Sequence, residues 1–428
     1  MLRLYNIALL PFRTAVVAWS RRPGRDPASR REWDERRGRG LHEIRPRGVW
    51  LHGASVGEAR LVHAVATALR QRRPELPLAA SCTTPAGRRS LPRPPEVDEA
   101  FFGPLDFAGW PARVLDAVRP SAVVLVETEL WPNLLAEAAT AGVPVVVVNG
   151  RLSASRMRRY RSISALLRPS LAGLFAVGAR SAADGERFGK LGVPADRVEV
   201  TGDLKYDLPP PSVPEAEVRR RLGLPAGRPV VVAGSTGPGE EALILDAFAA
   251  ARGCHPDLLL VLAPRHLQRV DEVVREVSRR GLAFARASEA EAPPPGVAVR
   301  VLDTMGDLAA AYGVATVAFV GGSLVPVGGH NLLEPASAGV PVLFGPHVDS
   351  VAETAAALEF AGAARRVGDA RELADAVVSL VADESRRREM SRSAEAVIRA
   401  HRGALDRSVR MILRAVDATR PASHLGTA

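Results

Sequence analysis

The sequence predicts a two-domain α/β protein in which each domain is built on a doubly wound parallel sheet. Short apolar runs without polar alternation recur through both halves of the 428 residues, as in strands that are buried on both faces. Amphipathic stretches separate these runs, which indicates parallel strands joined by crossover helices. A proline-rich stretch at 206–217 divides the chain into two parts, and each part is long enough to bury a core of its own.

Residues 1–20 predict a membrane-anchoring segment. They are apolar, with aromatic residues near both ends, but Pro11 and Arg13 interrupt the run. A spanning helix needs about 20 apolar residues, and a central arginine costs roughly 2.5 to 3.5 kcal/mol, so we expect an anchor that lies in the membrane interface. The arginines between 21 and 39 and the formal net charge of +10 favour an anionic membrane surface over nucleic acid as the partner.

The rest of the chain is expected to form an N-terminal domain over 21–205, a linker over 206–217, a second domain over 218–417 and a frayed tail over 418–428. The expected strands of the two domains are 48–52, 77–82, 122–126, 143–149, 174–177 and 198–201, and then 229–233, 258–263, 297–302, 316–320 and 341–344. Two cysteines, Cys82 and Cys254, indicate neither a disulfide framework nor a thiolate metal site, which fits a reducing cytoplasm.

The turn 52–58 joins the first expected strand to the first helix of the N-terminal domain. Open α/β sheets bind ligands at this carboxyl edge, so Glu58 is well placed for a site. Ser55 and Glu58 also match a capping box, in which Glu58 would only stabilise the start of the helix. Gly53, Ser55 and Gly57 formally match the G-x-S-x-G nucleophile elbow, so a serine hydrolase is a further alternative, although a capping serine would use its oxygen on a helix amide.

The next two strand ends of this domain also carry polar side chains. Glu127 and Glu129 follow the strand 122–126, and Trp131 comes two residues later. Carboxylates there could orient sugar hydroxyls, and an indole could stack on a sugar or acyl group. Arg151 follows the next strand and could bind an anion at the same edge. The alternative for both acids is a solvated helix start.

In the second domain, residues 316–346 combine a buried strand, a glycine-rich turn and the start of a helix. Glycines such as Gly322 let a ligand approach the backbone closely. Asn331 is expected to cap the helix and Glu334 to lie in its first turn, which would direct free amides at an anion and a carboxylate at a ribose diol. A tight turn with a capping box is the alternative.

The segment 233–241 follows the first strand of the second domain and is expected to form a phosphate loop. Ser235 and Thr236 offer hydroxyl groups and helix-start amides, but the lysine and the spacing of a Walker motif are missing. Arg265 ends the next strand and could bridge to the same anion or form an ordinary surface pair. Because no D-x-D pair, H-E-x-x-H motif or dinucleotide-binding glycine pattern occurs, we expect neither a metal nor a dinucleotide cofactor.

Seven segments of the chain together resemble one family, the 3-deoxy-D-manno-oct-2-ulosonic acid (Kdo) transferases of lipid A assembly. The resemblance begins in the apolar start, passes through REWDERRG at 31 and ends near residue 402. The segments are HGASVGE at 52, ETELWPN at 127, NGRLS at 149, TGDLKYD at 201, APRH at 263, DTMGDL at 303 and FVGGSLVPVGGHNLLEPASAGVPVLFGP at 319.

The resemblance implies a glycosyltransferase B fold, with two Rossmann-like domains that face each other across a cleft. It implies CMP-Kdo as donor, a co-substrate rather than a cofactor, and the tetraacyl glucosamine disaccharide phosphate precursor of lipid A as acceptor. Transfer would invert the anomeric centre without a metal, at the cytoplasmic face of the bacterial inner membrane. No obligate protein partner and no nucleic acid are implied.

The resemblance also implies roles for single residues. Glu58 would be the general base, and Lys205 would stabilise the departing phosphate. The acceptor-binding residues would be Glu127, Glu129, Trp131 and Arg151. The donor-binding residues would be Ser235, Thr236, Arg265, His266, Met305, Gly306, Gly322, Ser323, Asn331 and Glu334.

Three rival interpretations stay open at this point. The first is another nucleotide-sugar transferase, or a sugar-nucleotide epimerase, with the same two-domain architecture. The second is the serine hydrolase. The third is a basic protein without catalytic activity that docks on anionic lipid or nucleic acid through its net positive charge.

Overall fold

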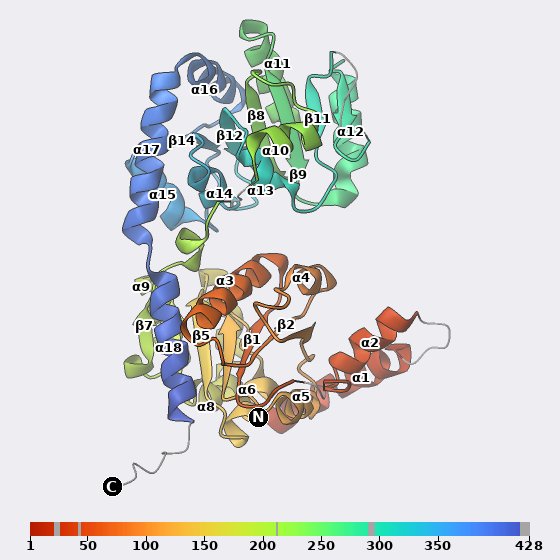
Figure 1. Ribbon diagram of the computed structural model, residues 1–428, viewed down its shortest axis with the longest axis vertical. Coiled ribbons are helices and arrows are strands. Elements are labelled where there is room, and N and C mark those ends of the chain that lie inside the picture. The colour runs from red at the N-terminus through yellow and green to blue at the C-terminus, as the bar shows by residue number, and fades with distance from the viewer. Residues whose placement is uncertain (21–25, 42–43, 211–212, 290–295, 420–428) are drawn as a thin grey trace. The chain divides into compact units, whose positions relative to one another are not determined.

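The computed structural model describes residues 1–428 except 21–25, 42–43, 211–212, 290–295 and 420–428, and it does not describe the side chains of residues 154 and 155. The chain forms two units (Figure 1). The first unit comprises Met1–Asp207 together with His401–Ala428, and the second comprises Leu208–Ala400. Each unit is described by itself.

The first unit contains a seven-stranded sheet in the order β3-β2-β1-β4-β5-β6-β7, and every neighbouring pair is parallel. This order reverses direction between β1 and β4, as in doubly wound nucleotide-binding folds. The strands are β1 (Val49–Gly53), β2 (Leu78–Cys82), β3 (Glu99–Phe102), β4 (Ala122–Val126), β5 (Val145–Gly150), β6 (Ala176–Ala179) and β7 (Val198–Val200).

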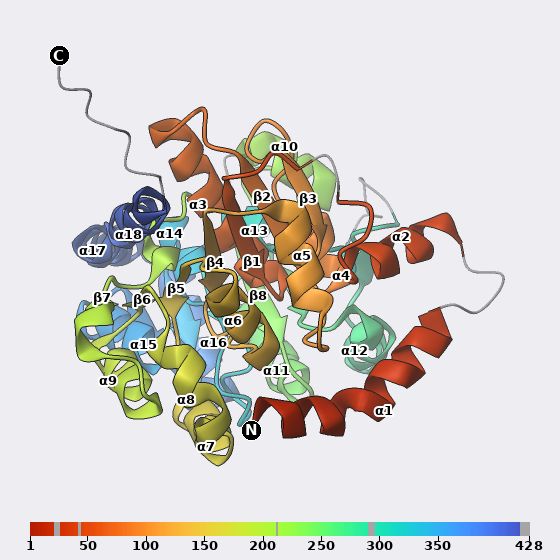
Figure 2. The ribbon, with the colours of Figure 1, turned by 90° about the horizontal axis from the view of Figure 1, so that it is seen from below.

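Helices cover this sheet on both faces, and Figures 1 and 2 show two views of the layers. The helices are α1 (Leu2–Ser20), α2 (Pro27–Glu35), α3 (Val56–Arg72), α4 (Pro85–Ser90), α5 (Trp110–Val118), α6 (Pro132–Thr140), α7 (Ala154–Ser162), α8 (Ser164–Ala172), α9 (Ala182–Leu191), η1 (Ala195–Arg197), η2 (Leu204–Asp207) and α18 (Ala404–Ala418). Valines fill β4 and β5, and every residue of both strands is buried. Such strands need cover on both sides, which the helices provide.

The second unit repeats the architecture with a seven-stranded parallel sheet in the order β10-β11-β9-β8-β12-β13-β14. Its strands are β8 (Val230–Thr236), β9 (Leu259–Pro264), β10 (Phe284–Arg286), β11 (Val299–Val301), β12 (Val317–Val320), β13 (Val342–Phe344) and β14 (Ala364–Arg366). Its helices are α10 (Glu215–Leu222), α11 (Glu240–Cys254), η3 (Leu267–Arg269), α12 (Val270–Arg279), α13 (Asp307–Tyr312), α14 (Leu333–Ser337), α15 (Ala352–Phe360), α16 (Ala370–Ala382) and α17 (Glu384–His401).

Alternate residues of β8 face two separate cores in the second unit. Val231 packs with Phe248 of α11 on one side of the sheet, whereas Val230 and Val232 pack with Leu222 of α10 on the other. The two-residue periodicity of a strand produces this alternation. The two doubly wound parallel sheets are therefore as the sequence predicts, while the cleft between the domains stays a prediction.

The last helix corrects the expected domain boundary. The sequence analysis assigned 218–417 to the second domain, but α18 belongs to the first unit, where it packs against α3 and strands β4, β5 and β6. Asp207 accepts hydrogen bonds from the amides of Gly403 and Leu405, both at 2.8 Å, and so fixes the start of α18. Amphipathic periodicity in 404–418 shows that the helix has an apolar face, but it cannot show which sheet that face covers.

Smaller differences concern the linker, the tail and the edge strands. The expected linker 206–217 is shorter, because η2 extends to Asp207 and α10 begins at Glu215. Most of the expected tail 418–428 lies outside the described residues. The sequence analysis missed β3, β10 and β14, which have three or four residues each and are too short for a clear periodicity.

Residues 1–20 form the helix α1 from Leu2 to Ser20, and no helix among the described residues combines the length and the apolar character that crossing a membrane requires. Several large apolar side chains of α1 are nevertheless exposed, namely Leu4, Ile7, Leu10, Phe12 and Trp19, as is that of Met1 directly before the helix. Tyr5 donates a hydrogen bond to Asp106 at 3.0 Å, and Asn6 accepts one from Asn133 at 2.8 Å. These bonds hold one side of α1 against the first unit.

We predict that Ile412→Ala, which truncates a fully buried side chain of α18, destabilises the first unit by about 2 to 5 kcal/mol. Hydrogen exchange should then accelerate in β4, β5 and β6 more than in β8 and β12. Ile398→Ala in α17 is the matched control and should show the opposite pattern, because Ile398 is buried in the second unit. Faster exchange in β8 and β12 for Ile412→Ala would contradict the position of α18.

Candidate functional site

The turn between β1 and α3 holds the side chain of Glu58 in a fixed position. Ser55 is the N-cap of α3, and a complete capping box is present. The Oε2 atom of Glu58 accepts hydrogen bonds from the amides of Ala54 and Ser55, the latter at 2.7 Å. No residue in the described part of the chain donates to Oε1. The carboxylate is therefore anchored through one oxygen. The residue is buried, with an exposed fraction of 7%.

Glu58 lies close to a second carboxylate, that of Glu127. Burial raises the pKa of Glu58, and the negative charge of Glu127 raises it further, while the hydrogen bonds within the turn oppose the shift. Glu127 directly follows β4 and has a φ of 63°, a left-handed conformation that residues with side chains adopt rarely. Because β1 and β4 flank the point where the strand order reverses, these two carboxylates occupy the usual ligand position of the fold.

Glu129 adds a third carboxyl group to this cluster. Burial raises its pKa to about 7, and the charge of Glu58 contributes in the same direction. The indole Nε1 of Trp131 donates a hydrogen bond to Oε2 of Glu129 at 2.8 Å, and Trp131 itself is 41% exposed. A largely buried acid therefore lies beside an exposed aromatic ring at the start of α6.

Two cationic side chains lie beside these carboxylates. The Nζ atom of Lys205 is 3.7 Å from Oε1 of Glu127. Burial lowers the pKa of Arg151, as does the charge of Arg180, whereas the charge of Glu127 raises it. The structure thus brings together the predicted first-domain residues Glu58, Lys205, Glu127, Glu129, Trp131 and Arg151 at one edge of one sheet.

Asn149 is a site residue that the sequence analysis did not identify. It is fully buried at the end of β5, has a φ of 54°, and its Oδ1 accepts a hydrogen bond from the amide of Leu204 at 2.8 Å. This bond holds the backbone next to Lys205. The sequence feature that could have identified it is an asparagine directly before a glycine at a strand end. Such an asparagine can indicate a left-handed backbone conformation, which asparagine tolerates better than most residues.

Arg36 is a second residue that was missed. Its guanidinium donates to the carbonyl of Thr83 at 2.7 Å, and the amide of Thr83 bonds in turn to the carbonyl of Gly53 at 3.2 Å. Arg36 therefore supports the turn that carries Glu58 indirectly, through the backbone of Thr83. The resemblance included REWDERRG without giving it a function, and no local pattern predicts a contact between α2 and a turn this distant in sequence.

The nucleophile-elbow interpretation is wrong. Ser55 accepts a hydrogen bond from the amide of Glu58 at 3.4 Å, which is its capping role. The adjacent histidine, His52, instead places Nδ1 2.7 Å from Oγ of Ser81, and burial together with the charge of Arg36 lowers its pKa to about 4. Ser55 therefore has no imidazole base among the described residues, as a serine hydrolase would require.

In the second unit, a buried glutamate occupies the amides of the expected anion-binding turn. Glu240, the first residue of α11, accepts from the amides of Gly322 at 2.6 Å and Ser323 at 3.0 Å, and also from those of Gly237 and Leu324. These groups cannot bind a donor phosphate at the same time. A carboxylate of the chain itself is therefore bound in this turn, and the prediction that Gly322 and Ser323 bind the donor stays a prediction.

The hydroxyl groups of Thr236 and Ser323 also have internal partners. Thr236 is buried and donates to Oε1 of Glu241 at 2.9 Å, and Glu241 pairs with Arg269 at 2.7 Å. Ser323 donates to the carbonyl of Val320 at 2.5 Å. The Thr236 hydroxyl thus already has a partner within the chain, and its expected role in phosphate binding stays a prediction. Ser235 lies partly exposed in the same turn with a φ of 57°.

The start of α14 differs from the prediction. Leu332 occupies the N-cap position and the helix has five residues, so Asn331 is not the cap; its Oδ1 accepts from the amide of Leu333 at 3.2 Å instead. The neighbouring His330 is mostly buried, and burial together with the charges of Arg265 and His266 lowers its pKa to about 4. His330, which the sequence analysis did not select, therefore lies near two predicted donor-binding side chains that are both exposed.

The remaining predicted donor-binding residues lie at the same carboxyl edge of the second sheet. Burial and the charge of Glu334 both raise the pKa of Tyr312, which places Glu334 near the end of α13. Met305 is 67% exposed, and Gly306 has a φ of 99° at the start of α13. The structure thus keeps Ser235, Arg265, His266, Met305, Gly306, Asn331 and Glu334 at this edge as candidates.

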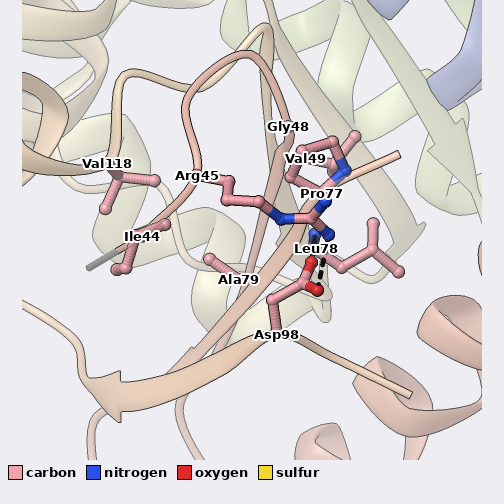
Figure 3. A pocket seen from close by; sticks show the side chains of 9 residues that line it. All are labelled: Ile44, Arg45, Gly48, Val49, Pro77, Leu78, Ala79, Asp98 and Val118. Atoms are coloured by element: carbon pink, nitrogen blue, oxygen red, sulfur yellow. Dashed lines mark hydrogen bonds and ion pairs between the residues drawn. The ribbon is translucent and has the colours of Figure 1, made fainter. Parts of the chain in front are cut away.

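No group of three or more potential metal ligands from histidine, cysteine and the acids occurs among the described residues. A cavity of about 10 Å³ lies between Gly48, Pro77 and Leu78. Figure 3 shows the side chains that line it, among which Arg45 and Asp98 form an ion pair at 2.7 Å. This cavity lies at the amino ends of β1 and β2, opposite the carboxyl edge that carries Glu58.

Comparisons with known proteins show which family the chain is similar to. A family model described as 3-deoxy-D-manno-octulosonic-acid transferase (kdotransferase) matches residues 31–208. The chain is 38% identical to a 3-deoxy-D-manno-octulosonic acid transferase of Bordetella pertussis over 84% of this chain and 86% of the relative. It is 34% identical to the enzyme of that name from Haemophilus influenzae, over 85% of this chain and 86% of the relative.

A solved structure shows the same fold at low sequence identity. The UDP-GlcNAc 2-epimerase of Neisseria meningitidis, bound to UDP-GlcNAc, matches with a TM-score of 0.59 and 13% identity. The match covers 87% of this chain and all of the epimerase chain. At this identity the likeness concerns the arrangement of two parallel-sheet α/β domains, and it does not extend to the reaction.

The pKa of Glu129 predicts a pH-dependent stability. The native carboxyl holds its proton up to about pH 7, whereas the unfolded chain releases it near pH 4.5. Its contribution to the free energy of unfolding therefore falls as the pH rises between these values. Glu129→Gln, which can still accept the Trp131 bond, should raise the melting temperature above that of the wild type at about pH 8 and less at about pH 5. Glu186→Gln at an exposed position is the control, and equal effects at both pH values would contradict the buried carboxyl.

Proposed function

The chain belongs to the 3-deoxy-D-manno-octulosonic acid (Kdo) transferase family, and from this premise we propose its complete reaction. As a member of this family it is a glycosyltransferase that transfers Kdo in lipopolysaccharide biosynthesis. We propose that the donor is CMP-Kdo and that the acceptor is the tetraacyl glucosamine disaccharide phosphate precursor of lipid A. We further propose that the transfer inverts the anomeric centre and needs no metal.

The observation that carries the proposal is the environment of Glu58. One carboxylate oxygen is fixed by two backbone amides, and no described residue donates to the other. Burial and the neighbouring Glu127 raise the pKa of the carboxyl, which makes it a stronger base than an exposed glutamate. The capping box and the basic role are therefore compatible, because they use different oxygens of the same side chain.

In the proposed step, Glu58 accepts the proton of an acceptor hydroxyl group while that oxygen attacks the anomeric carbon of Kdo. The bond between this carbon and the phosphate oxygen of CMP breaks, and CMP leaves with the bonding electrons. Attack on the face opposite the leaving group inverts the configuration. The carboxyl group then holds one proton, which it returns to water after product release.

Cationic and amide groups would stabilise the charge of the leaving phosphate. In the first unit, Lys205 is the cation next to Glu127, and its compact ammonium group suits a small oxyanion. In the second unit we propose Ser235, Arg265 and His266 for the nucleotide phosphate and Asn331 with Glu334 for the remainder of the nucleotide. Thr236, Gly322 and Ser323 are left out of this proposal, because the Thr236 hydroxyl donates to Glu241 and the amides of Gly322 and Ser323 donate to Glu240.

We also propose that the enzyme works at the cytoplasmic face of the inner membrane, with α1 lying in the interface. The support is the exposed apolar side chains of α1, including Leu4 at 63% and Ile7 at 65% exposure, together with the net charge of +10. Exposed apolar side chains on a helix favour insertion between lipid headgroups, and cationic residues are attracted to anionic lipids.

Incubation of the purified protein with CMP-Kdo and the lipid A precursor tests the reaction directly. Mass spectrometry should show the acceptor with one or more added Kdo residues, and the number of additions can be counted. Transfer should persist in excess EDTA. UDP-GlcNAc should be neither consumed nor epimerised, and turnover of this sugar nucleotide without Kdo transfer would support the epimerase alternative.

We predict that Glu58→Gln lowers kcat by about 10²- to 10⁴-fold, because base catalysis typically contributes this much. The melting temperature should change little, since a glutamine oxygen can accept the same backbone bonds. Ser55→Ala is the matched control: it should cost roughly 0.5 to 2 kcal/mol of stability through the lost cap but keep most of the activity. A Glu58→Gln enzyme within about tenfold of wild type would remove Glu58 from the base role.

We predict that the double substitution Leu4→Gln with Ile7→Gln shifts the protein from the membrane fraction to the supernatant. Both side chains are exposed, so the fold should persist, and transfer to a detergent-dispersed acceptor should be retained. Phe360→Gln, which alters an apolar side chain that is 96% exposed in the second unit, is the control and should leave partition unchanged. Unchanged partition of the double variant would show that another surface binds the membrane.

A further inference from the structure

Helix α7 has an unusual charge pattern. It carries four arginines and no acidic residue in Ala154–Ser162. None of these arginines forms an ion pair with any residue that the structure describes. Exposed arginines of other helices differ: in α17, Arg386 pairs with Glu389 and Arg388 with Glu384, both at 2.6 Å. The positive charge of α7 is therefore not neutralised by its own helix.

The helix is fixed next to the carboxylate cluster of the first unit. Tyr160 donates a hydrogen bond to the carbonyl of Thr128 at 3.1 Å, and Thr128 lies between Glu127 and Glu129 in sequence. Ser153 caps the helix start by accepting from the amide of Arg156 at 3.2 Å. Arg156 is close enough to Glu129 for its charge to oppose the rise in the pKa of that carboxyl.

The periodicity of the helix separates its arginines into two groups. Arg156 and Tyr160 are four residues apart and share a face, and Arg159, three residues after Arg156, flanks the same face. Arg158 lies two residues from both Arg156 and Tyr160 and is therefore on the opposite side. All three arginines are exposed. Arg156 and Arg159 thus lie on the side of the helix next to the carboxylate cluster, and Arg158 lies on the other side.

A phosphorylated acceptor would need such a group of cations. Glu58, Glu127 and Glu129 would repel an anionic molecule that approaches the base, and Lys205 and Arg151 offset this only in part. A guanidinium group presents parallel N–H donors that match the oxygens of a phosphate, and it stays charged at any physiological pH. Two guanidinium groups at the edge of the cluster would both attract the phosphate and fix its position.

We propose that Arg156 and Arg159 form a binding site for a phosphate monoester of the acceptor. This inference rests on the proposed function, in which the acceptor is a phosphorylated glycolipid. The two arginines bind the phosphate while the acceptor hydroxyl group lies at Glu58. The site therefore acts in acceptor recognition and orientation, and it takes no part in the transfer of the proton.

The test compares Arg156→Gln, Arg159→Gln and the control Arg158→Gln on two acceptors dispersed in detergent, the lipid A precursor and its enzymatically dephosphorylated form. With the phosphorylated acceptor, Arg156→Gln and Arg159→Gln should each raise KM about tenfold or more, as expected for the loss of a charge-assisted hydrogen bond. Their kcat should change little. For the wild type, the KM for the dephosphorylated acceptor should be higher than that for the phosphorylated acceptor. Neither substitution should raise the KM for the dephosphorylated acceptor further. Arg158→Gln should match the wild type with both acceptors.

Three results would overturn the inference. Equal losses with both acceptors would show that the arginines support the fold or another part of the substrate. An unchanged KM with the phosphorylated acceptor, combined with weaker binding of all three variants to anionic phospholipid vesicles, would assign the arginines to the bilayer surface. A wild-type enzyme that transfers Kdo to neither acceptor would overturn the proposed function as well, whereas the first two results leave it intact.

Discussion

The carboxylate of Glu58 accepts hydrogen bonds from the backbone amides of Ala54 and Ser55, and the site of the first unit depends on this interaction. The bonds fix the carboxylate at the end of β1, beside Glu127 at the end of β4. Both strands flank the reversal of strand order, where parallel sheets leave space for a ligand. Without the turn, Glu58 would be an ordinary residue on a helix surface.

The second unit places a glutamate at the corresponding position, and the comparison shows how environment determines role. Glu240 follows β8, the central strand of its sheet, as Glu58 follows β1, and both lie in the first turn of the next helix. Glu240 accepts bonds from four backbone amides through both oxygens and is fully buried. From the residues that the structure describes, Glu58 accepts bonds through Oε2 alone. A carboxylate with both oxygens satisfied organises a loop, whereas one with an unoccupied oxygen can exchange a proton.

The balance of charge at the first-unit cluster follows from the same constraint. Burial raises the pKa values of Glu58 and Glu129, and the charge of a neighbouring carboxylate raises each of them further, so the three carboxyl groups cannot all ionise without cost. Lys205 and Arg151 offset part of it, and Arg156 of α7 adds positive charge near Glu129. A site that must both remove a proton and admit an anionic substrate needs separate regions of opposite charge, and the ends of β1, β4 and β5 provide them side by side.

The sequence by itself determined the two parallel sheets, the helix start at Glu58 and the polar ends of β4 and β5. These features depend on local periodicity, on capping residues and on where apolar runs end, and all three can be recognised in the amino-acid sequence alone. For the same reason the family resemblance could be read from short segments, and the comparisons confirm it.

Only the tertiary structure decided which groups are available to a ligand and which element covers which sheet. Gly322 and Ser323 were expected to line the donor site, but their amides bind the carboxylate of Glu240, more than 80 residues earlier in the chain. Helix α18 was expected to belong to the second domain, but it covers the first sheet. In both cases the deciding contact joins residues far apart in sequence. Local propensities cannot predict such contacts, because the partner of a buried hydrogen bond or of an apolar helix face is determined only when distant parts of the chain come together in the fold.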